Sequence, residues 1–348
     1  MKIENRNIGE GYPCFIIAEL SANHGGDIDI AIETIKAAKR AGADAIKLQT
    51  YTADTLTIDS DKDHFKIDKG TLWDGKTLYE LYEEAYTPWE WHQKLFDVAK
   101  DEGLICFSSP FDFSAVDFLE SLNVPAYKIA SFEIQDIPLI EYTASKGKPI
   151  IISTGIAKEE DIALAVQTCR NTGNNDITLL KCTSSYPAPL ELANLKTIED
   201  LKERFQTEVG FSDHTYGWLA PSIAVSLGAK IIEKHFILNK SIESADADFS
   251  LDEGEFKEMV SKVRDAEKLL GKVSYELSEK VQKNKKFARS LFVVKDGKKG
   301  ETITEDHIRS IRPGYGLHPK HYKEVLGKKF TKDVERGDPL SLNMIDQS

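Results

Sequence analysis

The sequence contains no long hydrophobic run and has no excess of basic residues. No stretch of its 348 residues reaches the roughly 18 apolar residues needed to span a bilayer, and the first fifteen residues show no basic segment leading into an apolar one. We therefore expect a cytoplasmic protein with no membrane partner. The formal net charge is −12, which argues against nucleic acid as a main partner, because a polyanion selects a basic surface.

Cysteine is scarce, and the four cysteines are far apart in the sequence. Cys14, Cys106, Cys169 and Cys182 form no C-x-x-C pair and lie mostly within apolar runs. This distribution predicts reduced, buried thiols. No G-x-G-x-x-G follows the first apolar run, which argues against a dinucleotide-binding site.

Short apolar runs of strand length alternate with longer helical segments. Runs that are apolar throughout, without alternation, are typical of parallel strands buried on both faces. These runs cover residues 14–18, 45–49, 104–108, 126–130, 149–153, 177–182, 208–212 and 230–235. Helical segments include 27–42, 89–103, 159–173 and 254–271. Eight alternations within about 270 residues predict a (β/α)8 TIM barrel of the α/β class.

The rhythm of the barrel changes at two places. Residues 51–88 form a long insertion whose tyrosines and tryptophans predict an ordered cover over the barrel mouth rather than a disordered loop. After Gly271 a lysine-rich stretch leads into short β-like pieces separated by turn residues. We therefore predict a barrel over residues 1–272, a linker over 273–288 and a small β-rich domain over 289–348.

Polar side chains gather where the predicted strands end. In a TIM barrel the active site forms at the carboxyl ends of the strands, so these residues are the candidates for chemistry. They are Glu19, Lys47, Gln49, Ser108, Ser109, Lys128, Ser131, Glu133, Ser153, Thr154, Lys181, Thr183, Tyr186, Ser212, Asp213, His214, Glu233, Lys234 and His235.

Two groups among these residues leave alternatives open. His214 and His235, on neighbouring strands and with Asp246 or Glu19 nearby, could hold a divalent ion, or they could be hydrogen-bonded structural residues. Lys47 and Lys128 could cradle a phosphate or carboxylate, or they could pair with acidic neighbours. A desolvated lysine at this position could instead form a Schiff base, as in an aldolase.

A series of motifs resembles the sialic-acid synthase family along essentially the whole chain. The matching pieces are AELSANHGGD (18–27), GADAIKLQTY (42–51), FSSPFD (107–112), YKIASFEI (127–134), IISTGIA (151–157), LLKCTSSYPAP (179–189), VGFSDHTYG (209–217), IIEKHF (231–236) and IRPGYGLHP (311–319). The resemblance implies a phosphoenolpyruvate-dependent synthase, a transferase that forms a C–C bond. It also implies that the C-terminal domain is antifreeze-like, of the SAF type.

Two segments are most similar to the pseudaminic acid synthase branch: LWDGKTLYELYEEAYTPWEWH (72–92) and ESADADFSL (243–251). The second departs from the P-G-P-D-H run usual in the N-acetylneuraminate and legionaminate branches. The implied sugar is 2,4-diacetamido-2,4,6-trideoxy-L-altrose, and the implied product is pseudaminic acid. The alternatives are synthesis of N-acetylneuraminate or legionaminate from another N-acetylamino sugar, a Schiff-base aldolase, and a sugar-sensing protein without catalysis.

The resemblance also assigns roles to individual residues. His214 and His235 are expected to bind a divalent ion, Mn2+ first and Mg2+ or Co2+ as alternatives, and Glu19 to activate water. Arg312 is expected to reach the sugar in the partner's barrel, which implies a homodimer with exchanged C-terminal domains. Phosphoenolpyruvate is expected to contact Lys47, Lys128, Ser131, Ser153, Thr183 and Ser212. The sugar is expected to contact Gln49, Glu133, Tyr186 and Asp246.

Overall fold

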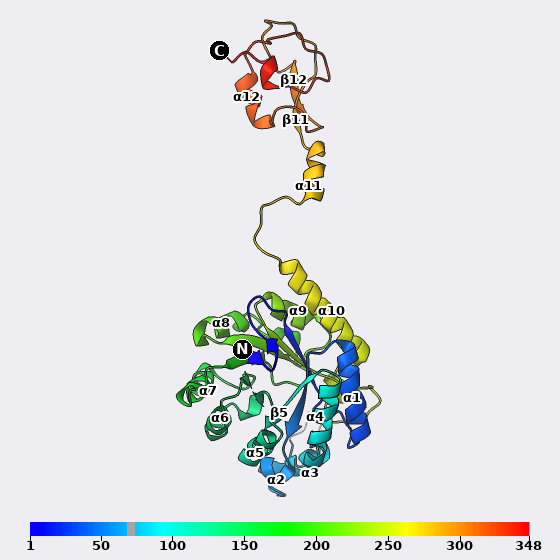
Figure 1. Cartoon of the computed structure of the whole chain (residues 1–348), viewed down its shortest axis with the longest axis vertical. Coiled ribbons are helices and arrows are strands. Elements are labelled where there is room, and N and C mark those ends of the chain that lie inside the picture. The colour runs from blue at the N-terminus through cyan, green and yellow to red at the C-terminus, as the bar shows by residue number, and fades with distance from the viewer. Residues whose placement is uncertain (68–73, 348) are drawn as a thin grey trace. The chain divides into compact units, whose positions relative to one another are not determined.

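The computed structural model describes residues 1–67 and 74–347 (Figure 1). The chain divides into two compact units, Met1–Gly271 and Lys272–Ser348. Each unit has its own hydrophobic core.

The first unit is a closed barrel of eight parallel strands. Around the barrel, β10 closes the ring by pairing with both β9 and β3. Its strands are β3 (Phe15–Glu19), β4 (Ala45–Thr50), β5 (Ile105–Pro110), β6 (Tyr127–Ile129), β7 (Ile150–Ser153), β8 (Ile177–Cys182), β9 (Glu208–Asp213) and β10 (Ile231–His235). The predicted TIM barrel is confirmed, and each strand lies at the apolar run expected for it.

Helices connect the strands and surround the barrel (Figure 1). The first begins after Asp27, which caps it by accepting a hydrogen bond from Asp29 N, and ends at Gly42, whose φ of 93° closes the helix in the left-handed region. The helices of this unit are α1 (Ile28–Ala41), α2 (Ala53–Leu56), α3 (Leu78–Ala85), α4 (His92–Asp101), α5 (Phe113–Ser121), α6 (Ile137–Ala144), α7 (Glu159–Asn171), α8 (Thr197–Phe205), α9 (Leu219–Ser226) and α10 (Glu253–Leu270).

Alternate strand residues point to opposite sides of the barrel wall. An inner core cluster of this unit contains Phe15, Ile17, Ala45, Phe107, Ala126, Ile151, Leu180 and Ile231. Their neighbours in sequence, such as Ile16, Ile46 and Ile232, pack in the cluster that includes the surrounding helices. Because side chains alternate along a strand, Glu19, Lys47, Lys128, Ser212 and Glu233 continue the inner series toward the carboxyl ends.

A small hairpin and the insertion complete this unit. The hairpin pairs β1 (Lys2–Ile3) with β2 (Arg6–Asn7), and Ile3 and Ile8 join the inner core. The insertion forms α2 and α3, and Trp89, just after it, donates a hydrogen bond to the Tyr51 carbonyl at 3.1 Å. Residues 68–73, part of the predicted cover, lie outside the described residues. The ordered cover over residues 51–88 stays a prediction.

The second unit contains one two-stranded antiparallel sheet among the residues described, β11 (Ser290–Val293) with β12 (Ile308–Ile311). Its core includes Leu291, Val293 and Phe330. The predicted β-rich domain also contains a short helix, α12 (Tyr322–Val325), which packs into the core through Val325. The stretch predicted as a linker carries a short helix, α11 (Glu279–Lys283). The exact domain boundaries remain predictions.

Two predictions about residue types can be compared with the structure. All four cysteines are buried and free. None of the described helices combines the length and apolar character needed to cross a membrane.

A buried ion pair lies on the outer side of the barrel wall. Lys234 and Asp213 have the opposite strand parity to Glu233 and Ser212, so they face the surrounding helices. Lys234 Nζ lies 2.5 Å from Asp213 Oδ2 and also donates to the Thr215 carbonyl. Both side chains are fully buried.

We predict that Asp213→Ala lowers the free energy of unfolding by about 3–5 kcal/mol, because it leaves the Lys234 ammonium buried without its partner. Urea unfolding followed by circular dichroism measures the loss. The matched control is Asp265→Ala, which removes the partner of exposed Lys268 and should change stability little. Equal losses in the two variants would contradict a special cost at the buried pair.

Candidate active site

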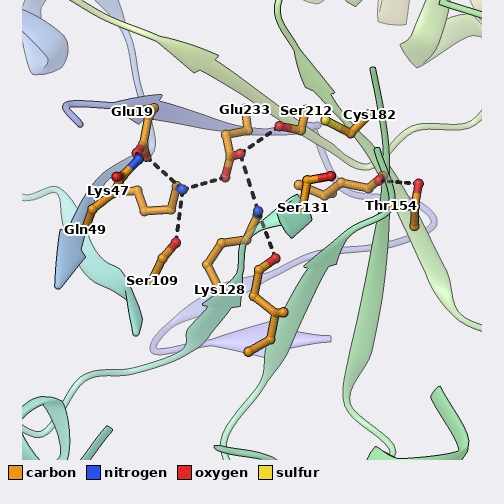
Figure 2. Close-up of polar contacts among 12 residues, drawn as sticks. Glu19, Lys47, Gln49, Ser109, Lys128, Ser131, Thr154, Cys182, Ser212 and Glu233 are labelled. Carbon is orange, nitrogen blue, oxygen red and sulfur yellow. Dashed lines mark hydrogen bonds and ion pairs between the residues drawn. The ribbon is translucent and has the colours of Figure 1, made fainter. Parts of the chain in front are cut away.

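Glu233 lies at the centre of a buried charged cluster at the carboxyl ends of the strands (Figure 2). Its Oε2 is 3.5 Å from Lys47 Nζ, and its Oε1 is 3.7 Å from Lys128 Nζ. Ser212 donates a hydrogen bond to Oε1 at 2.9 Å. One carboxylate from β10 therefore links a lysine from β4, two strands away in the ring, with a lysine from β6, on the opposite side of the barrel.

A second carboxylate, Glu19, holds the other side of Lys47. Lys47 Nζ lies 2.9 Å from Glu19 Oε2 and 3.2 Å from Ser109 Oγ. Gln49 donates from Nε2 to Glu19 Oε1 and to Ser21 Oγ, each at 2.9 Å. The position of the Glu19 carboxylate is therefore set by two neighbours on one strand.

The two carboxyl groups differ in their affinity for a proton. Burial raises the pKa of Glu19 to about 7, although the positive charge of Lys47 opposes the rise. Burial also tends to raise the pKa of Glu233, but the two lysines outweigh it and lower that pKa to about 2. Glu233 is consequently a fixed anion at neutral pH, whereas Glu19 can both accept and release a proton there.

The two lysines also differ. Burial tends to lower the pKa of Lys47, yet the charges of Glu19 and Glu233 outweigh it and the pKa is raised. For Lys128 burial dominates, and its pKa is lowered despite Glu233. Both ammonium groups lie within reach of a single small anion placed beside Glu233.

Hydroxyl groups complete the surroundings of the lysines. Ser153 Oγ is buried with no hydrogen-bond partner among the described residues, so it can donate to a ligand. Ser131 accepts hydrogen bonds from Ile156 N at 3.2 Å and from Ser184 Oγ at 2.8 Å, which leaves its own proton free to donate. Lysines and free hydroxyls together make a suitable site for a phosphate or carboxylate.

The two candidate metal ligands lie side by side. The rings of His214 and His235 have centroids 5.4 Å apart. Burial is the largest cause that lowers the pKa of each to about 3, so both imidazoles are neutral, the form that binds metal.

The hydrogen bonds of the two rings leave lone pairs for a ligand. His214 Nδ1 lies 3.1 Å from the Thr183 carbonyl, which can only accept, so Nδ1 carries the proton and Nε2 is left as the acceptor. His235 Nδ1 is buried without a hydrogen-bond partner in the described residues. These atoms suit a divalent ion as a two-histidine site. No group of three or more His, Cys, Asp or Glu positioned for a metal occurs in the described part of the chain, so further ligands would come from water or substrate.

Two of the residues expected at the sugar, Tyr186 and Asp246, lie beside the histidines. The Tyr186 ring has its centroid 4.5 Å from that of His214. Asp246 Oδ2 lies 3.6 Å from His235 Nδ1. Glu133 Oε2 is buried and unpartnered in the described structure, and burial raises the pKa of Glu133 to about 7.

The hydroxyl of one expected site residue bonds outside the cluster, and another expected residue belongs to the second unit. The Thr183 hydroxyl donates to the Leu192 carbonyl at 3.2 Å and accepts from Lys181, so only its own carbonyl touches the cluster through His214. Arg312 is an exposed residue of the second unit. Its role in the site stays a prediction.

The central role of Glu233 was missed at the level of sequence. The sequence places Glu233 at a polar strand end but does not indicate a function for it. Strand parity could have found it, because positions 231, 233 and 235 alternate as Ile, Glu and His and therefore share one face. Its link to both lysines depends on how β10 meets the other strands.

The comparisons with known proteins give the family. Residues 34–275 match the model of the NeuB family, and residues 288–346 match the SAF domain. The chain belongs to the NeuB family. The predicted resemblance to sialic-acid synthases and the predicted SAF domain are thereby confirmed.

Individual relatives cover nearly the whole chain. A pseudaminic acid synthase of Campylobacter jejuni is 55% identical over 340 residues, 98% of each chain. A pseudaminic acid synthase of Helicobacter pylori is 50% identical, covering 97% of this chain and 99% of its own. Among solved structures, an N-acetylneuraminic acid synthetase from Leptospira borgpetersenii in complex with citrate has a TM-score of 0.72 at 31% identity, over 82% of this chain and 94% of that one.

We predict that Lys128→Met weakens binding of inorganic phosphate about tenfold or more, because a charge-assisted hydrogen bond is lost. Calorimetric titration measures the affinity. The control is Lys181→Met on β8. The Lys181 ammonium donates to the Cys182 carbonyl at 2.6 Å, and Lys181 belongs to the strand residues that alternate with the inward-facing ones. Unchanged binding in Lys128→Met, or an equal loss in the control, would argue against the two-lysine site.

Proposed function

We propose that this NeuB-family chain is a pseudaminic acid synthase. It condenses phosphoenolpyruvate with 2,4-diacetamido-2,4,6-trideoxy-L-altrose and releases phosphate by C–O cleavage. The observation that carries this assignment is the 55% identity to a curated pseudaminic acid synthase over 98% of both chains. The buried pair of lysines supports it, since the reaction needs a site for a phosphorylated carboxylate.

The anionic substrate is held by the inner series of side chains. Lys47 and Lys128 neutralise the phosphate and carboxylate, and Ser131 and Ser153 donate hydrogen bonds. Ser212 contacts the substrate by exchanging its hydrogen bond to Glu233 for one to the ligand. Glu233 supports this arrangement by fixing the positions of both ammonium groups before the substrate arrives. Thr183 contacts the substrate only if its hydroxyl gives up the hydrogen bond to the Leu192 carbonyl.

Glu19 acts as the general base. After C3 of phosphoenolpyruvate attacks the aldehyde carbon, positive charge develops at C2, and water adds there. Glu19 takes the proton from that water, and the tetrahedral carbon then expels phosphate with breakage of its C–O bond. A carboxyl group with a pKa near 7 suits this transfer, because it releases and accepts a proton readily at neutral pH.

Enzymes of this family generally depend on a metal ion. In this chain His214 and His235 would hold it, with Mn2+ as the proposed ion and Mg2+ or Co2+ as alternatives. The bound ion would act as a Lewis acid that polarises the sugar aldehyde. Gln49, Glu133, Tyr186 and Asp246 orient the sugar, the carboxyl groups by accepting hydrogen bonds from its amide and hydroxyl groups.

The ion pairs at Lys47 disfavour the aldolase alternative for that residue. A Schiff base requires a neutral amine, and the two carboxylates beside Lys47 favour its charged form. Synthesis of N-acetylneuraminate or legionaminate remains the alternative within the family.

The assignment is tested by phosphate release from phosphoenolpyruvate with the purified protein. We expect release with the trideoxy-altrose but much less with N-acetylmannosamine, and loss of release after chelation of divalent ions. Readdition of Mn2+ should restore it. Preference for N-acetylmannosamine would move the chain to another branch of the family, and no release with either sugar would refute the proposal.

The active form is proposed to be a cytoplasmic homodimer in which Arg312 of one subunit contacts the sugar's acetamido group in the partner. On this basis Arg312→Ala should raise KM for the sugar about tenfold or more while leaving KM for phosphoenolpyruvate within about twofold, because only the sugar loses a charged hydrogen bond. Steady-state kinetics measure both constants. Arg336→Ala, which removes another exposed arginine of the second unit, is the control. Equal changes in the two constants would contradict the assignment.

A further inference from the structure

Three aromatic rings form a layer at the barrel mouth, beside the start and end of the insertion. The Tyr51 ring lies edge-on to Tyr82 of α3, with centroids 5.8 Å apart, and edge-on to Phe111, with centroids 5.1 Å apart. We call Tyr51, Tyr82 and Phe111 the aromatic layer. Tyr51 is 4% exposed, so the layer is packed rather than loosely placed on the surface.

The layer continues the inward-facing series of two strands. Tyr51 follows Gln49 by two residues, and Phe111 follows Ser109 by two. Because alternate residues share a face, these two rings stand one step nearer the mouth than Gln49 and Ser109. Ser109 in turn contacts Lys47 at 3.2 Å. Since Tyr51 and Phe111 directly follow the ends of β4 and β5, the layer lies on the mouth side of the proposed substrate groups, and it contributes no charge of its own.

The layer also borders both carboxyl groups proposed to bind the sugar. Burial raises the pKa of Tyr82, and the charge of Glu133 raises it further. Burial likewise raises the pKa of Tyr51, and the charge of Asp246 adds to the rise. Both carboxyl groups are therefore close enough to act electrostatically on members of the layer. The Tyr82 hydroxyl makes no hydrogen bond to another described residue that would direct it away from a ligand.

The chemistry of the proposed sugar assigns one of its ends to this layer. Its aldehyde carbon, C1, must approach phosphoenolpyruvate beside the lysines, at the bottom of the mouth. Its methyl carbon, C6, is the opposite end of the open chain and therefore lies nearest the mouth. An aromatic surface favours a methyl group there, since a hydroxyl group would lose its water without gaining a partner.

We propose that the aromatic layer is the subsite for the methyl end of the sugar, and that Tyr82 makes the enzyme prefer a 6-deoxy sugar to its 6-hydroxy counterpart. This inference rests on the proposed function. It gives the insertion a task in substrate selection, because Tyr51 and Tyr82 both lie within residues 51–88, and Tyr82 comes from its helix α3.

The test compares kcat/KM for the trideoxy-altrose with that for its 6-hydroxy counterpart in the full-length protein. Tyr82→Ala should lower kcat/KM for the 6-deoxy sugar about tenfold or more, through KM, and leave the 6-hydroxy sugar nearly unchanged. KM for phosphoenolpyruvate should not move. Tyr82→Phe should keep the preference, because it retains the ring.

The matched control is Tyr79→Ala on the same helix, whose hydroxyl donates to Asp54 at 3.3 Å. It removes an equal amount of aromatic surface from α3 and should keep the preference for the 6-deoxy sugar. Equal losses for both sugars in Tyr82→Ala would show that Tyr82 only packs the insertion and would overturn the inference. An unchanged preference in Tyr82→Ala, or an equal loss of preference in Tyr79→Ala, would overturn it as well.

A second pair of sugars separates this inference from the proposed function. N-acetylmannosamine and its 6-deoxy counterpart are assayed in parallel with the wild type and Tyr82→Ala. If the wild type used only this second pair, the pseudaminate assignment would be refuted. The inference would then stand if the wild type preferred the 6-deoxy member of the pair and Tyr82→Ala lost that preference, and it would fall otherwise. A wild type that uses none of the four sugars would refute both.

Discussion

The buried contact between Glu233 and two lysines is the interaction on which the site depends. Two ammonium groups left without counter-charges in the barrel interior would repel one another and lose their hydration, which costs several kcal/mol per ion. Glu233 removes most of that cost, and Glu19 supports Lys47 from the other side. Lys128 makes a hydrogen bond to the Ile129 carbonyl at 3.1 Å, and its 3.7 Å contact with Glu233 is longer than a hydrogen bond, so an entering phosphate or carboxylate still finds a donor there.

The rigidity of this cluster comes from the barrel. Its four charged residues stand on four different strands: Glu19, Lys47, Lys128 and Glu233. The parallel register aligns Glu19 with Lys47 on one side and with His235 on the other. A strand shifted by one residue would turn its polar end outward. The closed ring prevents such a shift, because β3 and β10 are each hydrogen-bonded on both sides. The placement of charge therefore follows from strand pairing more than from any single side chain.

Much of the fold and part of the site could be predicted from the sequence. The eight apolar runs were sufficient for the barrel, because strands buried on both faces leave a clear local pattern. Polar strand ends named most candidates, and the family motifs assigned their roles. The central position of Glu233 could not be predicted without register, since its partners are far away in sequence. The short helices α11 and α12 were missed because so few residues carry little periodic signal.

The side-chain contacts of Thr183 show a second limit to what can be predicted from the sequence. A threonine at a strand end predicts a hydroxyl facing the substrate, whereas the hydroxyl here bonds to the Leu192 carbonyl in the following loop. The direction of one short side chain depends on the path of the chain after the strand. Spacing along the sequence does not encode that path.

The contact between the His214 ring and the Thr183 backbone has one more consequence. The acceptor is a main-chain carbonyl, which every residue at position 183 would supply. The tautomer of His214 is therefore insulated from changes of side chain at position 183 and follows from the course of the chain after β8. A neighbouring acid or amide side chain often fixes a histidine tautomer, but here a backbone carbonyl does so. The His214 tautomer can therefore persist while the side chains of the loop change to suit a new substrate.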